Sequence, residues 1–197
     1  MTKLLILFFL TSCATFQKSI VERDLRKSSK KICLSAVGKG RLNIKGKKNI
    51  FGYESALDGD GHAWELALNF PLHKTEHFNL DWSTGKVKFK TSLEEKILKE
   101  NADVDPKSIE RFTSAIGRLL EEAINYQLDQ VKEETHFNWT VTGKSIEAKS
   151  CDDNINAVFT NLIDNQYFGL MSISYTESEV IEYKMDLIVR NCLQKKH

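Results

Sequence analysis

Apolar and polar residues alternate along most of the first half of the chain, which is the pattern of a half-buried β-strand. The apolar sets begin at Leu34, Phe51, Trp64, Phe78 and Val87. Turn signals separate them at 46–49, 58–61 and 83–85, with Pro71-Leu72 between the third and fourth sets. The first half therefore predicts a meander of five antiparallel strands with one apolar face.

The hydrophobic period then changes to that of a helix. Ser92 is expected to cap a short helix over 93–99. Asp105 followed by Pro106 is a helix start signal, and apolar residues recur from Ile109 at helical spacing. A long amphipathic helix is therefore predicted to about Glu134.

Strand alternation returns at Phe137 and continues through a turn at 143–144. Asp152 and Asp153 are expected to cap a helical turn running through Leu162, and two further strands follow over 169–175 and 181–189. Such a long antiparallel sheet tends to curl, and its apolar face needs a cover. The predicted fold class is α+β, mainly β: a strongly curved antiparallel sheet, or incomplete barrel, with the long helix as a lid.

The N-terminus has the order of a secretory leader, in which Lys3 precedes an apolar run and small residues follow. Leu10-Thr11-Ser12-Cys13 resembles the bacterial lipobox, in which the cysteine carries acyl chains such as palmitate and becomes the first mature residue. The alternative is an ordinary signal peptide with an incidental cysteine. The pattern divides the chain into a signal peptide (1–12), a tether (13–32) and one domain (33–197). In lipoproteins the next residue influences sorting, and Ala14 implies the outer membrane, facing the periplasm.

Composition narrows the class of protein further. The formal charge of +1 over 197 residues gives no nucleic-acid signal, and a monomer is expected. Cys33, Cys151 and Cys192 remain after lipidation, so one disulfide is plausible in an oxidising periplasm, with its pairing left open.

The stretches GKGRLNI, WELALNFPL and TEHFNLDWSTGKVKF resemble the LolB family of outer-membrane lipoprotein receptors and its soluble LolA relatives, best over 36–89. That resemblance implies an incomplete barrel whose helical lid covers a hydrophobic cavity. It also implies acyl chains of lipoproteins as ligands, a LolA-type periplasmic carrier as partner, and insertion of lipoproteins into the outer membrane. The alternative is a lipid-binding or scaffolding lipoprotein of the same fold that handles no lipoprotein cargo.

In the LolB family an Asn-Pro-Leu-Gly turn projects a leucine that acts at the membrane, and Pro71-Leu72 is the matching pair here. This chain has Phe70 inserted before the proline and His73 in place of the glycine. The leucine either projects into acyl chains, where burial is worth about 1.5–3 kcal/mol, or folds back over the barrel mouth. The residues expected to line the cavity are Leu42, Ile44, Trp64, Leu66, Leu68, Phe78, Leu80, Trp82, Phe112 and Ile116, each of which is also an ordinary core residue.

The sequence favours no catalytic or metal chemistry. It contains no GxSxG, P-loop or HExxH motif, and no spacing of Ser, His and Asp selects a triad. His73 and His77 follow a proline and enter a strand, so a shared metal site is not expected. Glu121-Glu122 is assigned to the solvated face of the long helix. We therefore expect neither an enzyme nor a cofactor; a hydrolase would need a polar cleft with perturbed titratable groups.

Overall fold

The computed structural model describes residues 31–81, 83–84, 88–100, 105–127, 135–142, 144–151, 154–177 and 180–193. The strands of the first half are β1 (Lys31–Ile32), β2 (Ala36–Ile44), β3 (Lys47–Leu57), β4 (Ala63–Asn69), β5 (Glu76–Asp81) and β6 (Lys88–Thr91). The helices α2 (Leu93–Glu100) and α3 (Pro106–Gln127) follow. The second half contains β7 (Phe137–Val141), β8 (Ile146–Ser150), β9 (Ile155–Ile163), β10 (Tyr167–Glu177) and β11 (Val180–Cys192).

All these strands belong to one sheet, in the order β6-β5-β4-β3-β2-β11-β10-β9-β8-β7. Neighbours along this path are antiparallel, and the short β1 adds to β10 in parallel. The two halves of the chain meet where β2 pairs with β11, from Ile44 opposite Tyr183 to Ala36 opposite Cys192. Among the described strands, β6 and β7 end the path at opposite edges, so the sheet stays open.

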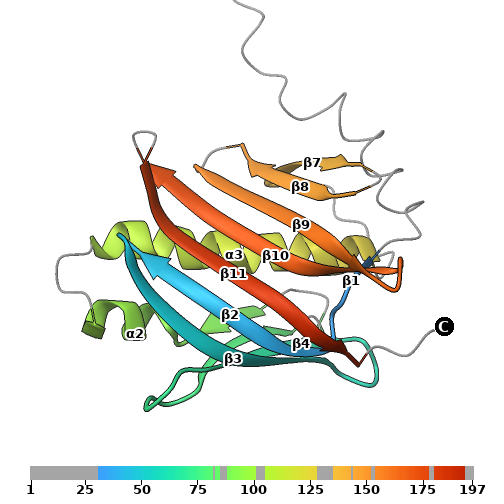
Figure 1. Cartoon of the computed structure of the whole chain (residues 1–197), viewed down its shortest axis with the longest axis horizontal. Helices are drawn as coiled ribbons and strands as arrows, with labels where there is room; N and C mark the ends of the chain where they lie inside the picture. Colours follow the sequence, from blue (N-terminus) through green and yellow to red (C-terminus); the bar gives the residue numbers. More distant parts are fainter. Residues whose placement is uncertain are drawn as a thin grey trace, which may run out of the picture.

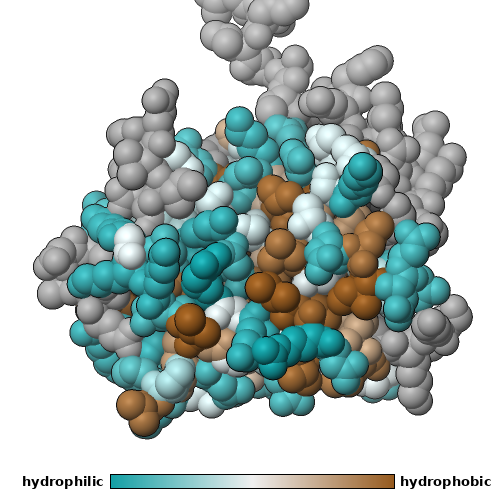
Figure 2. All heavy atoms as spheres, viewed as in Figure 1, coloured by the Kyte–Doolittle hydropathy of each residue, from teal (hydrophilic) through white to brown (hydrophobic). Residues whose placement is uncertain are grey.

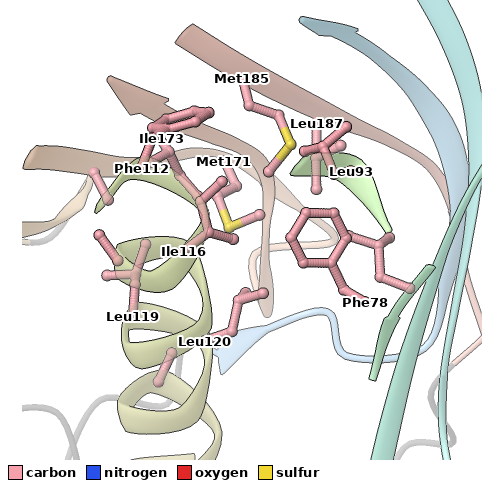
Figure 3. Packing of buried hydrophobic residues seen from close by; sticks show 14 of the residues in the cluster. Phe78, Leu93, Phe112, Ile116, Leu119, Leu120, Met171, Ile173, Met185 and Leu187 are labelled. Carbon is pink, nitrogen blue, oxygen red and sulfur yellow. The ribbon is translucent and has the colours of Figure 1, made fainter. Parts of the chain in front are cut away.

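The sheet curves around α3, which lies behind it in the view of Figure 1. Side chains from α3, β5, α2, β10 and β11 converge between the helix and the sheet (Figure 3). At the start of α3, the Phe112 ring stacks on Tyr183 of β11 with 5.4 Å between centroids, and Ser108 Oγ lies 2.9 Å from the Tyr183 hydroxyl. The predicted fold class, a curved open sheet with a long helical lid, is confirmed.

The alternation predicted for the first four apolar sets is confirmed in β2 to β5, and β2 alternates buried and more exposed positions along its whole length. Val87, where the fifth set begins, lies outside the described residues. One turn differs from the prediction. The hairpin between β2 and β3 turns at Lys45 and Gly46, both with positive φ, and 47–49 belong to β3 rather than to a turn. A two-residue turn of this kind matches the right-handed twist of the strands, so β3 begins earlier than the polar run suggested.

The two helix starts differ in whether the predicted residue caps them. Asp105 caps α3 as predicted, because its Oδ1 accepts the Lys107 N–H at 3.2 Å. Ser92 directly precedes α2, but its Oγ accepts the His77 N–H of β5 at 3.0 Å. The hydroxyl of Thr91 instead accepts the Leu93 N–H at 3.1 Å. The end predicted for the long helix, near Glu134, lies outside the described residues.

The helical turn expected after Asp152 and Asp153 is wrong. Residues Ile155–Ile163 form β9, which pairs with β8 on one side and β10 on the other. Ile155, Ala157 and Phe159 are buried at a spacing of two. Packing of this apolar face decided the conformation, whatever the two aspartates favour locally.

The outer face of the sheet mixes polar and apolar side chains (Figure 2). Its centre contains a buried aspartate, Asp186 of β11, which accepts hydrogen bonds from Ser172 Oγ at 2.7 Å and Arg41 Nη2 at 3.0 Å. Burial acts to raise the pKa of Asp186, but these hydrogen bonds and the nearby Lys184 charge lower it below its ordinary value. Asp186 thus links β2, β10 and β11 as an anion.

A disulfide joins the segment that directly follows the first strand to the end of the last strand. Cys33 and Cys192 are bonded across 159 positions of sequence, while Cys151 is an exposed thiol. The bond holds the segment 31–35, which we call the N-terminal strap, against the end of β11. Trp64 Nε1 donates to the Leu34 carbonyl at 2.6 Å and ties the strap to β4 as well.

Candidate functional site

The connection between β4 and β5 is a tight turn built on Pro71 and Leu72. The His73 N–H donates to the Phe70 carbonyl at 3.3 Å, and Leu72 has φ of +63°. Proline fixes φ at the first central position of such a turn, whereas the second normally takes glycine or asparagine because φ is positive there. Thr75 Oγ1 donates to Asn69 Oδ1 at 2.8 Å and closes the base of the connection. We call residues 70–75 the Leu72 turn.

Phe70 anchors this turn in the core. Its side chain is buried, and its ring lies 4.9 Å from the Phe51 ring of β3. On its other side, the Lys96 ammonium of α2 lies 4.3 Å from the Phe70 ring centroid, a cation–π contact. Phe70, one of the two residues that depart from the LolB pattern, therefore fixes the turn to the sheet and to α2.

Leu72 points away from the domain. Its exposed fraction is 104%, the largest among the exposed apolar side chains of the described residues. The alternative that it folds back over the barrel mouth does not occur. Leucine is unfavourable here twice over: its side chain contacts water, and a left-handed backbone costs a residue with a Cβ roughly 1–2 kcal/mol. Neither feature helps the isolated fold.

The residues expected to line a cavity lie in the core. All of those described are buried: Leu42, Ile44, Trp64, Leu66, Leu68, Phe78, Leu80, Phe112 and Ile116. Trp82 and Cys13 lie outside the described residues. Figure 3 shows Phe78, Phe112 and Ile116 pointing into the interior among neighbouring core side chains. The described members of this set therefore belong to the hydrophobic core.

A small apolar cavity remains beneath the N-terminal strap. It has a volume of about 40 Å³, and its walls include Ile32 and Leu34 of the strap, Trp64 and Leu66 of β4, and Ile124 of α3. This volume suits a few water molecules at most and is far below the roughly 300–1,000 Å³ of a small-molecule site. A longer ligand requires the strap or the helix to move.

The long helix also holds a buried carboxylate that the sequence placed on a solvated face. Glu122 is 5% exposed, and its Oε2 accepts the Trp139 indole N–H at 2.9 Å while Oε1 accepts the His136 N–H at 2.5 Å. Burial raises the pKa of Glu122, and the hydrogen bonds to Trp139 and the backbone act against that rise. Its neighbour Glu121 is half-buried. Glu122 therefore fastens the lid to β7.

The described histidines do not assemble a metal site. His77 Nδ1 lies 2.7 Å from Glu65 Oε1 across the β4–β5 pair, and His73 is on the exposed Leu72 turn. No group of three or more His, Cys, Asp or Glu side chains is placed to hold a metal ion in the part of the chain that the structure describes. Within the same residues, no helix combines the length and apolar character needed to cross a bilayer.

The structure defines a fold class, which is an open, curved antiparallel sheet with a helical lid. This is the fold that the resemblance to the LolB family implied. No family model matches the chain, and no curated protein matches it. Among solved structures, the chain is similar to MucB at 10% sequence identity and a TM-score of 0.42, covering 91% of this chain and 60% of that one. It is also similar to MucB in complex with MucA(peri), at 9% identity and a TM-score of 0.36, covering 87% and 52%. The chain thus spans little more than half the length of these structures.

Proposed function

We propose that this protein is a lipid-anchored binding protein that works at a bilayer surface, with Leu72 entering the acyl layer. The observation that carries the proposal is the exposed leucine held at positive φ on an anchored turn. Backbone strain of this kind concentrates at functional sites, and a water-exposed leucine gains free energy only when something apolar covers it. Acyl chains would provide that cover.

The N-terminus supports the same location. Acyl chains on Cys13 would hold the protein at the outer membrane, facing the periplasm. The proposed role there is binding and not catalysis. The N-terminal strap begins beside β10, where Lys31 lies opposite Tyr167. In Figure 1 this point is on the other side of the molecule from the connection between β4 and β5. The residues between Cys13 and Lys31 span at most about 60 Å when extended, so the anchor would permit the Leu72 turn to reach the same bilayer.

Vesicle flotation tests this proposal. The chain from Ala14 onward, produced without its anchor, contains every described core residue and is compared with Leu72→Glu. We expect the variant to lose at least tenfold in vesicle binding, because a charge replaces the inserted side chain. Leu193→Glu is the matched control, because Leu193 is also exposed but lies beside the strap. Equal binding by Leu72→Glu and the unchanged chain would reject the proposal.

A narrower function, acceptance of acylated lipoproteins from a LolA-type carrier, is favoured by the apolar cavity beneath the strap. Its present volume does not hold an acyl chain, so this function needs an opened state. Mild detergent extraction followed by mass spectrometry separates the two functions. Acylated protein recovered from the domain would support the carrier, and depletion should then strand lipoproteins on the donor. Free lipid or no ligand would favour a lipid-contacting lipoprotein without cargo.

A further inference from the structure

The β2–β3 hairpin continues the surface around the Leu72 turn. Asn69, the last residue of β4, pairs with Gly52, so the first five residues of β3 extend beyond β4. The Leu72 turn follows directly, and the contact between the Phe70 and Phe51 rings places it beside this extension. Figure 1 shows the hairpin and the β4–β5 connection at the same end of the sheet.

A second apolar side chain is exposed on the extension. Ile50 is 64% exposed and directly precedes Phe51, whose ring packs on the anchor of the Leu72 turn. Its side chain alternates with the buried Phe51 and so lies on the outer face of the sheet. Ile50 and Leu72 are the two most exposed of the large hydrophobic side chains in the described residues.

The charges on the two segments that carry these side chains have one sign. Residues 44–50 and 69–75 contain four lysines and no acidic residue: Lys45, Lys47, Lys48 and Lys74. All four are exposed. Lysines on segments that also expose apolar side chains fit a bilayer with anionic headgroups, where the apolar side chains enter the acyl layer and the ammonium groups stay at the surface.

We propose that the β2–β3 hairpin and the Leu72 turn together form a contact surface for an anionic lipid bilayer, with Ile50 as a second inserting residue and Lys47, Lys48 and Lys74 at the headgroups. This inference rests on the proposed membrane function and adds the lipid class and the second element. Anionic lipid explains both the projecting apolar tips and the single sign of charge, whereas an acidic protein or nucleic acid would leave Leu72 without an apolar environment.

The test compares vesicles of phosphatidylcholine alone with vesicles that also contain phosphatidylglycerol. A lysine near an anionic surface contributes about fivefold to binding, so Lys47→Gln/Lys48→Gln should bind anionic vesicles about 25-fold more weakly. Binding to phosphatidylcholine alone should not change. Ile50→Ser should reduce binding to both kinds by up to about tenfold. Added salt should weaken binding only to the anionic vesicles.

Lys39→Gln/Arg190→Gln is the matched control, because both residues are exposed on strands β2 and β11 and the change in net charge is the same. Two outcomes would overturn this surface while leaving Leu72 insertion in place. One is an equal loss of anionic-vesicle binding in the two double variants. The other is equal binding of the unchanged chain to the two kinds of vesicle. Anionic binding that needs the lysines but not Leu72 would overturn Leu72 insertion, and with it the joint surface, and would leave only the hairpin as a contact for anionic lipid. No binding to either vesicle would overturn both. Matching urea denaturation midpoints would establish that the variants are folded.

Discussion

Leu72 makes stability and membrane binding separable in one experiment. Its backbone lies at φ of +63°, and its side chain is fully exposed. Leu72→Asn keeps the turn, since asparagine tolerates the left-handed region, and it removes no buried surface from the fold. The substitution should therefore make the protein more stable and less able to bind a bilayer.

The expected sizes follow from these two features. A left-handed backbone costs leucine roughly 1–2 kcal/mol, and asparagine recovers part of this, so we expect stabilisation of about 0.5–1 kcal/mol. In a chain of this length the melting temperature should rise by about 1–4 °C. Loss of the inserted leucine removes up to about 1.5–3 kcal/mol of binding, which weakens vesicle binding roughly tenfold to hundredfold.

Thermal unfolding followed by circular dichroism measures the first effect, and vesicle flotation the second. Leu72→Ile is the paired control: it keeps the apolar side chain but adds branching at Cβ, which is less compatible with positive φ. It should bind vesicles about as well and melt at a lower temperature. A lower melting temperature for Leu72→Asn would show that Leu72 supports the fold, and unchanged vesicle binding would show that Leu72 does not enter the membrane.

Three further predictions concern the fold. Glu122→Gln should destabilise the domain by about 1–3 kcal/mol in urea denaturation, because one N–H donor would face the new amide group. Burial raises the pKa of Glu122, so its contribution to stability is full below the unfolded-state pKa and falls as pH rises through the folded-state pKa. The variant should lack this pH dependence, and its persistence in the variant would contradict the assignment. Replacing Cys33 and Cys192 by serine should lower stability by up to about 5 kcal/mol, as expected for a loop closed across 159 positions, while Cys151→Ser should leave the urea midpoint unchanged. Gly40→Ala should cost roughly 1–3 kcal/mol by the same measurement, since its Cβ would lie 2.1 Å from a core aromatic ring; an unchanged midpoint would mean that the ring moves freely.

Local patterns predicted most of the elements. Side chains of a strand alternate between two faces, so burial of one face is visible as a period of two from Leu34 onward. β9 was missed although Ile155, Ala157 and Phe159 have this same period, because Asp152-Asp153 resembles a helix cap. The turn of the candidate site was located in the same way, from Pro71 and the alternation on either side.

Other features depend on contacts between distant segments. Whether Leu72 projects or folds back was open in the sequence, because it depends on Phe70 packing between β3 and α2. Glu122 is polar and lies on an amphipathic helix, so only the arrival of β7, with its indole donor, explains its burial. Ile50 beside the Leu72 turn is likewise a result of strand register.

The order of residues alone determined most of the strands, the start of α3 and the position of the leucine turn, because backbone geometry repeats over a few residues. Tertiary structure decided that β2 pairs with β11 and that Cys33 bonds Cys192. These outcomes join residues more than a hundred positions apart. They depend on how whole elements pack, which no short-range pattern specifies.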